Sequence, residues 1–421
     1  MNKILYPLLL ISATSYAMEK TSPAQSDNQL QLIQNIYTGL GIEKSTGECQ
    51  KILAVAKGRD RRAAQIYRYH GRPLRAPWRD SYMTSVRAVQ STTTPASAPK
   101  NPCFICDQFS KPDEYEKNNI YDIDETSGEM LNLKPYGPLH SLINPQVCST
   151  RWENIPEEAR FQMLVKAQRW LSKIRELGID DAQIFLNLLD VCAGKSADHA
   201  HEHFLPRIVG DTSAIASMIG EDIVKSERQK LKKVELESGK TTLWYGIKKW
   251  NPEALKRVYS PYIQLLSSMD VPRNLRYACD CYACEVAYDK DNDQENLVIK
   301  RFDDGWIFRL VNIFINGHST LHHAQHGKTF AHLDKQELQR FNELITVCQL
   351  KVQEVLKPRG LNIGILEGEE AGNEFPHARC DIVQREAGAV SATTVFTDNY
   401  IGDRNLEMLR ERMVKSFESN D

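Results

Sequence analysis

Two segments of the chain place apolar residues at helical spacing, and each is followed by a short run with strand character. One helix is expected over 156–178, where a proline and two glutamates fit the first turn. The other is expected over 334–358, with Asp334 as its N-cap. Strands are expected at 183–189 and 361–366. Strands before and after one long helix predict an α+β class rather than a doubly wound sheet.

The two segments belong to a repeat with an offset of 178 residues. Cys103-x-x-Cys106 opens the first copy and Cys281-x-x-Cys284 opens the second. The same offset relates further pairs: His140 and His318, Gly194 and Gly372, His199 and His377, Arg207 and Arg385. Because cysteine and histidine are rare, chance is a poor explanation, and the sequence predicts a tandem duplication of one domain.

The rest of the chain is assigned around the two copies. The repeat predicts an N-terminal extension over 18–101, a first domain over 102–215, a connector over 216–277 and a second domain over 278–421. Within the extension, 57–87 is basic and is expected to be a solvated arm or, alternatively, one that faces phosphate; 88–101 has the composition of a linker. Within the connector, 225–240 is expected to be an exposed helix without chemistry.

Composition excludes several classes of protein. With 421 residues, 41% hydrophobic and 26% charged, the chain is not collagen-like, coiled-coil or wholly disordered. Its net charge of −2 gives no general attraction to nucleic acid or to an anionic membrane. One lysine, the apolar run 4–11 and small residues up to Ala17 resemble a secretory signal over 1–17, which predicts a periplasmic or secreted protein; otherwise it is cytoplasmic. No other stretch approaches the length of a membrane span, so no stable membrane insertion is expected.

The most specific signal is the sequence His199-Ala-His201-Glu-His203. On a strand, alternate side chains share a face, so the three imidazoles are expected to project together. Three imidazoles on one face form either a metal site or a relay around a nucleophilic histidine. Packing gains little from such a cluster, so a purely structural role is a poor alternative.

This segment resembles the histidine triad (HIT) superfamily, in which His-x-His-x-His is followed by two apolar residues and often by Pro-Arg. The lead-in Ala193-Gly194-x-Ser196 and the upstream Asn132-x-x-Pro-Tyr-x-Pro-x-His140 match the same family. The resemblance is to bacterial diadenosine-tetraphosphate phosphorylase-like members and, in its two-half layout, to galactose-1-phosphate uridylyltransferases. It implies two antiparallel sheets, each with a long helix, joined as an intramolecular pseudo-dimer in a monomeric chain.

The resemblance also implies an activity and the roles of residues. His201 would attack the α-phosphorus of a nucleoside phosphate derivative, a dinucleoside polyphosphate or phosphoramidate, and form a nucleotidyl-histidine. His199 and His203 would orient it, Ser196 would bind phosphate, and Asn132 and Asn187 would bind ribose or phosphate. Two alternatives stay open: a non-catalytic nucleotide-binding or interaction protein of the same fold, and a zinc hydrolase with the three histidines as ligands.

At two positions the chain departs from the pattern of the family, and at a third its residue distinguishes between two branches of the family. Asn187 lies one residue further from the Ala-Gly pair than in relatives. Glu202 replaces an apolar residue, which predicts that its face of the strand is partly wet. His203 stands where the uridylyltransferase branch has Gln, which favours hydrolysis or phosphorolysis over exchange of a sugar nucleotide.

The second copy lacks this chemistry. At the offset of 178, His201 becomes Arg379, His203 becomes Asp381, Ser196 becomes Glu374 and Asn132 becomes Leu310. Because arginine stays protonated, it cannot serve as a nucleophile. The second copy is therefore expected to be inactive and to act as the partner half of the pseudo-dimer.

The cysteines suggest one structural zinc ion in each copy. Cys148 lies 42 residues after Cys106, and His199 lies 51 after Cys148; His326 and His377 repeat these spacings after Cys284. Zinc-bearing relatives use such a set, so the predicted ligands are Cys103, Cys106, Cys148 and His199, and Cys281, Cys284, His326 and His377. The alternative is a disulfide in each Cys-x-x-Cys pair, as export would favour.

Overall fold

The computed structural model describes residues 23–66, 103–189, 197, 199–230, 242–269, 281–311, 317–373, 375–385 and 406–419. The expected signal at 1–17, residues 67–87 of the basic arm, the linker 88–101 and Ser196 lie outside these residues. Among the residues described, no helix combines the length and the apolar character needed to cross a bilayer.

Within these ranges, ten strands form one antiparallel sheet in the order β1-β2-β3-β5-β4-β9-β10-β8-β7-β6. The first five come from the first copy: β1 (Ile120–Ile123), β2 (Ser127–Leu131), β3 (Ser141–Pro145), β4 (Asp181–Leu189) and β5 (Glu202–Arg207). The other five come from the second: β6 (Val298–Arg301), β7 (Trp306–Leu310), β8 (Ser319–His323), β9 (Gly360–Glu367) and β10 (Arg379–Arg385). The copies meet where β4 pairs with β9, which confirms the predicted α+β fold and its pseudo-dimer.

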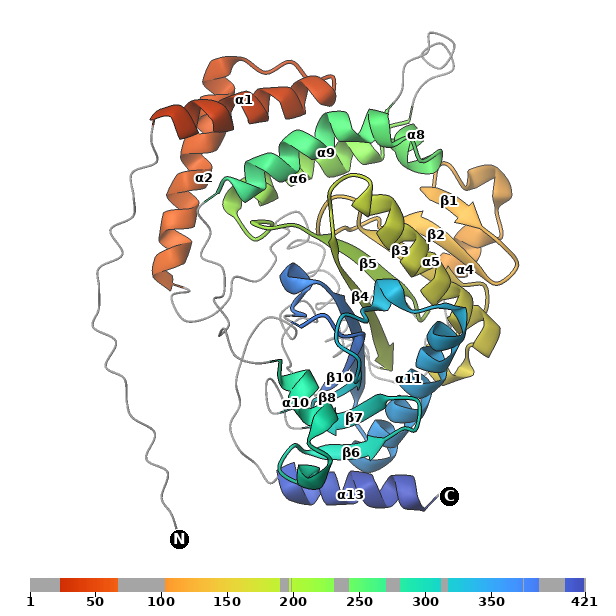
Figure 1. The fold of residues 1–421 in the computed structure, drawn as a ribbon. Helices are drawn as coiled ribbons and strands as arrows, with labels where there is room; N and C mark the ends of the chain where they lie inside the picture. The colour runs from red at the N-terminus through yellow and green to blue at the C-terminus, as the bar shows by residue number, and fades with distance from the viewer. Residues whose placement is uncertain are drawn as a thin grey trace, which may run out of the picture.

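One long helix of each copy covers the same face of this sheet. α5 (Glu157–Arg175) follows Pro156 and has two glutamates in its first turn and basic residues in its last, which complements the helix dipole. α11 (Lys335–Leu356) begins with a capping box in which Asp334 and Glu337 bond each other's backbone. Both helices stand where the sequence predicted them, and they contact one another (Figure 1). The other face of the sheet is left for the candidate site.

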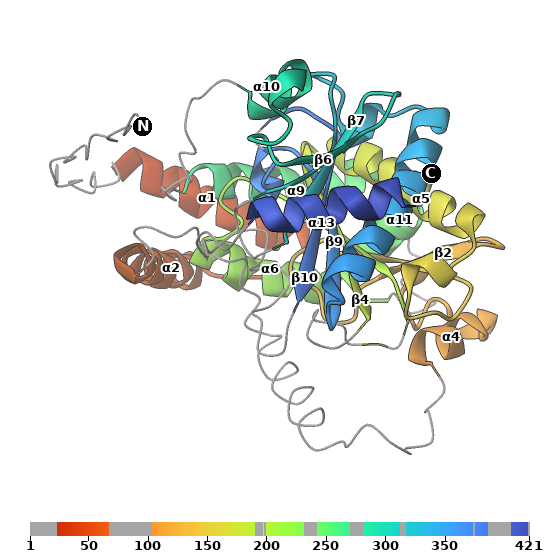
Figure 2. The ribbon, with the colours of Figure 1, turned by 90° about the horizontal axis from the view of Figure 1, so that it is seen from below.

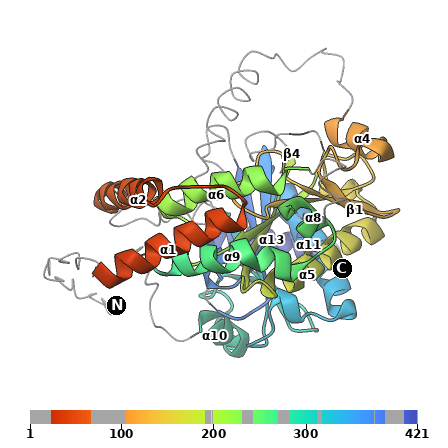
Figure 3. The same ribbon diagram turned by 90° about the horizontal axis from the view of Figure 1, so that it is seen from above.

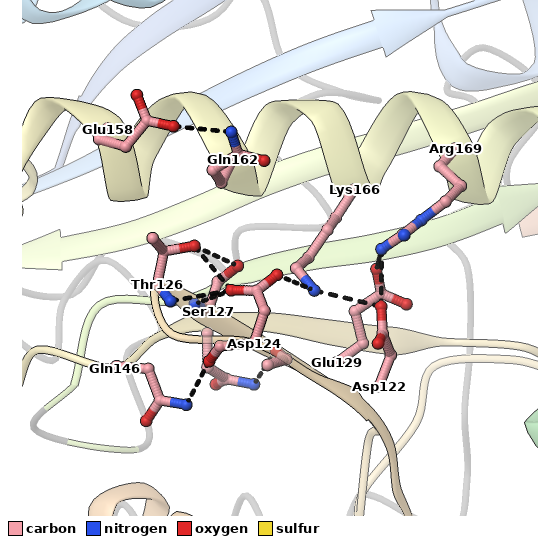
Figure 4. Close-up of polar contacts among 12 residues, drawn as sticks. Asp122, Asp124, Thr126, Ser127, Glu129, Gln146, Glu158, Gln162, Lys166 and Arg169 are labelled. Carbon is pink, nitrogen blue, oxygen red and sulfur yellow. Dashed lines mark hydrogen bonds and ion pairs between the residues drawn. The ribbon is translucent and has the colours of Figure 1, made fainter.

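Ion pairs fix α5 to the outer hairpin of the first copy. Lys166 lies 2.8 Å from Asp124, and Arg169 lies 2.6 Å from Asp122 and 3.0 Å from Glu129 (Figure 4). The Lys166 side chain is almost fully buried, so its pairing with two partly exposed carboxylates satisfies a charge that would otherwise be costly.

A separate group of helices joins the N-terminal extension to the connector. Its members are α1 (Pro23–Gly39), α2 (Thr46–Ile66), α6 (Ala214–Glu227), α8 (Leu243–Lys248) and α9 (Pro252–Ser267). α1 packs on α9 and α2 packs on α6 (Figure 3). The remaining α-helices of the described residues are α4 (Phe104–Phe109), α10 (Tyr282–Tyr288) and α13 (Leu406–Glu418), and α13 packs beside α11 and β6 (Figure 2).

Of the helix expected over 225–240, the described part 225–230 is helical only as far as Glu227, where α6 ends, and residues 228–230 are not helical. The connector also has a role near the site. Glu227 is buried and accepts hydrogen bonds from the Leu139 backbone, at 2.8 Å, and from the Tyr259 hydroxyl. Arg228 donates to the Asn132 carbonyl. These bonds hold the turn that presents Asn132 and His140.

Candidate active site

His203 is placed by three neighbouring strands. It lies in β5 opposite Leu142 of β3 and Phe185 of β4. The Phe185 ring stacks on its imidazole with centroids 4.6 Å apart and planes at 8°. The His201 ring lies 4.7 Å from His203 on the same side of the chain. Both residues lie on the sheet face opposite the long helices, where His201 is 4% exposed and His203 is 5% exposed.

The tautomer of His201 is fixed by a backbone carbonyl two residues earlier in the chain. Its Nδ1 lies 2.7 Å from the carbonyl oxygen of His199. A carbonyl only accepts, so Nδ1 carries the hydrogen of the neutral ring and Nε2 carries the lone pair. This is the tautomer that a nucleophile acting through Nε2 requires.

A third imidazole, His140, joins this pair. The Tyr136 backbone N–H donates to His140 Nδ1 at 2.9 Å, and His140 Nε2 lies 3.1 Å from His203 Nδ1. The Tyr136 ring stacks on His140 as well. Sequence reasoning did not place His140, Tyr136 or Phe185 in the site, although His140 ends the upstream motif that matches the HIT pattern.

The expectation that the three triad histidines share one face is wrong for His199. β5 begins only at Glu202, so strand alternation does not extend back to His199. Its Nδ1 lies 3.4 Å from Cys103 Sγ and 3.5 Å from Cys106 Sγ, and its Nε2 lies 3.0 Å from the Pro145 carbonyl. Both ring nitrogens are therefore engaged away from His201, which leaves no common point at which all three could bind a metal.

The four ligands predicted for the first copy do come together. The donor atoms of Cys103, Cys106, Cys148 and His199 all lie within 4.8 Å of one another. Sulfur and nitrogen atoms in a tetrahedral zinc site stand about 3.5 Å apart, close to the distances between His199 and the two thiols. Burial and the neighbouring thiols raise the pKa of Cys106 to about 12, because several thiolates without a cation repel one another. The donor set therefore fits a divalent metal.

The second copy repeats the cluster. Cys281, Cys284, His326 and His377 also lie within 4.8 Å, with Cys284 Sγ 3.3 Å from His326 Nδ1. His377 turns Nε2 toward the thiols and Nδ1 toward the His323 carbonyl at 2.8 Å. That carbonyl corresponds to the Pro145 carbonyl that holds His199, so His199 and His377 each have a backbone acceptor on the ring nitrogen that faces away from the thiols. All four thiols of the two Cys-x-x-Cys pairs are free, rather than joined as disulfides.

The two predicted asparagines occupy different places. Asn132 is buried, accepts from the Lys134 backbone at 2.8 Å and lies 3.2 Å from His140 Nε2. Asn187 is buried in β4, with its Nδ2 3.4 Å from His203 Nε2 and its Oδ1 2.7 Å from Asn362 Nδ2. Asn362 belongs to β9 of the second copy and carried no signal in the sequence.

The expectation of a partly wet face at Glu202 is wrong. Glu202 has no exposed area and lies between Ile143 and Leu186, on the face that the long helices cover. Neither carboxylate oxygen has a hydrogen-bond partner among the described residues. Burial raises the pKa of Glu202 to about 8, so the carboxyl is protonated at neutral pH.

The two positions of the second copy that correspond to His201 and His203 hold an ion pair. Arg379 donates from Nε and Nη2 to the two Asp381 oxygens, both at 2.9 Å, and His318 Nε2 lies 3.6 Å from Asp381. Burial alone raises the pKa of Asp381, but Arg379 and His318 outweigh it and hold the pKa well below its usual range. A fixed arginine–carboxylate pair offers no nucleophile; Glu374 lies outside the described residues.

The family model of the HIT domain matches the chain twice, over residues 113–209 and 291–387. Each limit of the second match lies 178 residues after the corresponding limit of the first. The protein contains two HIT domains in tandem. The quartet of thiols and imidazoles is common to both copies, and His140 has a counterpart in His318, whereas the histidines at 201 and 203 belong to the first copy alone.

Named proteins resemble parts or most of the chain. An AP-4-A phosphorylase of Mycobacterium tuberculosis is 24% identical over 152 residues, which is 36% of this chain and 75% of that protein. A bis(5'-adenosyl)-triphosphatase of Dictyostelium discoideum is 30% identical over 91 residues, 22% of this chain and 61% of that protein. A solved GalT-like protein of Arabidopsis thaliana aligns over 69% of this chain and 84% of that chain, with 16% identity and a TM-score of 0.43.

Proposed function

We propose that the protein is a nucleotidyl hydrolase or nucleotidyltransferase that acts at the α-phosphate of a dinucleoside polyphosphate or a nucleoside phosphoramidate, with His201 as nucleophile. The observation that carries this proposal is the bond between His201 Nδ1 and the His199 carbonyl, because it selects the nucleophilic tautomer at Nε2. The similarity to an AP-4-A phosphorylase and a bis(5'-adenosyl)-triphosphatase supports the same class of substrate.

The reaction then has two displacements at one phosphorus. His201 Nε2 attacks the α-phosphorus, the bond to the leaving group breaks, and the leaving group departs with the electron pair. The ring gains positive charge, which the His199 carbonyl stabilises through the hydrogen on Nδ1. Water or phosphate next attacks the nucleotidyl-His201, loses its proton and returns the electron pair to Nε2. The roles proposed for His203 and Asn132 are to hold the ring and the ribose or phosphate during these steps; Ser196 would bind the phosphate.

We also propose one structural zinc ion in each HIT domain, held by the two Cys/His quartets. The support is the fit of the thiol–imidazole distances and the presence of the quartet in the domain that has lost the nucleophile. Bound zinc would cross-link the segment before β5 to α4 and to the end of β3. This link would add to the free energy of folding. His199 would thereby fix the carbonyl that orients His201.

The test is a substrate panel of dinucleoside polyphosphates and adenosine phosphoramidates, followed by mass-spectrometric trapping of a nucleotidyl adduct. The wild-type protein is expected to release a mononucleotide and to carry the adduct on His201. His201→Asn is expected to lose turnover and adduct together while still binding nucleotide, and Arg379→Asn is the matched control in the second domain, expected to turn over normally.

Turnover by His201→Asn would overturn the assignment of the nucleophile. Nucleotide binding without turnover by the wild-type protein would instead support the non-catalytic nucleotide-binding alternative. Metal analysis that finds no zinc near stoichiometric amounts would overturn the metal proposal without touching the catalytic one.

A further inference from the structure

We propose that the second HIT domain binds the phosphate group of a small molecule on the face that corresponds to the candidate active site, with Arg309 and Arg379 as its cationic ligands. The inference goes beyond the proposed function, because it concerns the domain that has no nucleophile. Arg379 stands at the position of His201, so the phosphate would be held there without covalent attack.

Alternation along three strands places both arginines on this face of the sheet. Phe308, Leu321 and Cys380 belong to the core beneath the long helices. Because side chains alternate along a strand, the residues next to them in β7, β8 and β10 lie on the opposite face. These residues are Arg309, Thr320, His322, Arg379 and Asp381. The second domain therefore gathers polar and charged side chains on the face where the first domain carries its histidines.

The first HIT domain has apolar residues where the second has Arg309 and Thr320. In the row of the sheet that carries His203, Leu142 lies opposite Met130. In the corresponding row of the second domain, Thr320 lies opposite Arg309. Met130 and Leu142 pack in an apolar cluster with α4, so this position can be filled without any charge. An arginine in such a place is costly unless an anion accompanies it.

Arg309 has little compensation for its charge. It is 9% exposed and forms no ion pair with a carboxylate of the described residues. It donates one long hydrogen bond, of 3.4 Å, to the Asn296 carbonyl, and its buried Nε has no partner among those residues. The Tyr282 ring, 4.4 Å from the guanidinium carbon, attracts the cation but brings no negative charge. Burial lowers the pKa of Arg309 and Arg379 adds to this shift, although Tyr282 and Asp381 oppose it.

Asp381 does not neutralise both arginines. Its two oxygens accept from Nε and Nη2 of Arg379, which leaves Nη1 of Arg379 outside the pair. Two arginines and one carboxylate leave an excess of one positive charge. The Arg379 side chain is 21% exposed, so the patch is open to solvent at this end. An anion can therefore reach the arginines from solution.

The available donors fit a phosphate group better than a carboxylate. Arg309 and Arg379 both have guanidinium N–H groups outside the Asp381 pair, and His322, opposite Arg379, has a buried Nε2 without a hydrogen-bond partner among the described residues. A phosphate group presents three acceptor oxygens, so it can bridge two guanidiniums and still accept a further bond. A carboxylate has only two oxygens, which one guanidinium already occupies.

The decisive experiment observes the arginine directly, by proton–nitrogen NMR of arginine-labelled full-length protein during titration with inorganic phosphate. The Arg309 Nε–H signal, assigned by its loss in Arg309→Met, is expected to shift and to saturate. Methionine is the residue at the corresponding place in the first domain. Arg309→Lys keeps the charge at this position, gives a second assignment, and is expected to bind phosphate more weakly than wild type, because it lacks the fork of donors.

Thermal unfolding gives the second readout. Phosphate is expected to raise the Tm of wild type, since a ligand of the folded state stabilises it. Arg309→Met is expected to have the higher Tm without phosphate, because a buried cation is gone, and to weaken phosphate binding at this site at least about tenfold. The matched control is Arg340→Met, since Arg340 lies in α11 and pairs with Asp304. It is expected to keep the wild-type response to phosphate.

An Arg309 signal that does not move with phosphate, or that moves equally with sodium chloride, would overturn the inference. A tighter response to acetate than to phosphate would overturn the choice of a phosphate group over a carboxylate. A response to phosphate supports it, and a comparison with AMP then identifies the source: tighter binding of AMP assigns the site to a nucleotide, and tighter binding of phosphate to the free ion. The signal belongs to the second domain, so failure of the proposed function in the first leaves this result intact.

Discussion

Replacing Glu202 with Gln should stabilise the protein at neutral pH. The carboxyl is fully buried between Ile143 and Leu186, and burial raises its pKa from 4.5 to about 8. Above pH 4.5 the unfolded chain ionises this group whereas the folded protein keeps it protonated, so unfolding releases a proton. The stability contributed by the neutral carboxyl is complete below pH 4.5 and is lost as the pH rises through about 8.

The size of the effect follows from the shift. Each unit of pKa difference corresponds to about 1.4 kcal/mol, so Glu202 costs about 3 kcal/mol at pH 7 relative to a side chain that does not ionise. Glutamine has nearly the same shape and stays neutral in both states. The free energy of unfolding of Glu202→Gln should therefore exceed that of wild type by less than about 1 kcal/mol near pH 5 and by about 3 kcal/mol at pH 7.

The assay is urea unfolding of wild type and Glu202→Gln at several values between pH 5 and pH 8. Glu129→Gln is the matched control, because Glu129 lies on the same face, across Ile143, and receives a bond from Arg169 at 3.0 Å. Burial raises the pKa of Glu129 as well, but Arg169 opposes this shift, so Glu129→Gln should gain less stability between pH 5 and pH 7 than Glu202→Gln does. A stability difference between Glu202→Gln and wild type that stays constant over this pH range would refute the reasoning.

Three further outcomes are expected. His201→Asn should lose turnover and the trapped adduct while keeping nucleotide binding, as measured with the substrate panel. Cys106→Ser should lower the zinc content from about two ions per chain to about one by elemental analysis, whereas Cys348→Ser, a buried free thiol outside both quartets, should leave it unchanged. Asp381→Asn should destabilise the protein by about 3 kcal/mol at pH 7 in urea unfolding, because Arg379 is left without its buried partner. This loss relative to wild type should shrink as the pH falls below 3.8, the ordinary pKa of the carboxyl, because Arg379 holds the folded pKa lower.

Patterns along the chain predicted the two long helices, the strand that follows each of them, and the two Cys/His quartets. The caps and apolar spacing of α5 and α11 are properties of consecutive residues, so the sequence contains them in full. The quartets were found because the same spacing occurs twice. The direction of His199 was predicted wrongly, because alternation holds only inside a strand and β5 starts three residues later.

Contacts that depend on the register between the domains could not be predicted. The offset of 178 makes Leu186 and Gly364 equivalent positions of the two copies, but they lie on opposite faces of the sheet. Leu186 lies opposite Ile363 under the long helices, whereas Gly364 lies opposite Phe185 on the face of the candidate site. The offset therefore slips by one residue within β4 and β9. Asn362 meets Asn187 only because of this register, and no periodicity along the chain records it.

The β4–β9 junction has a consequence for how the site responds to dilution. In a dimer of separate subunits, a contact such as Asn187–Asn362 would exist only at concentrations where the subunits associate. Here both strands belong to one polypeptide, so the contact forms at a fixed effective concentration and persists in a single molecule. Covalent linkage also frees the two halves from symmetry: an asparagine placed on one side of the junction need not appear on the other.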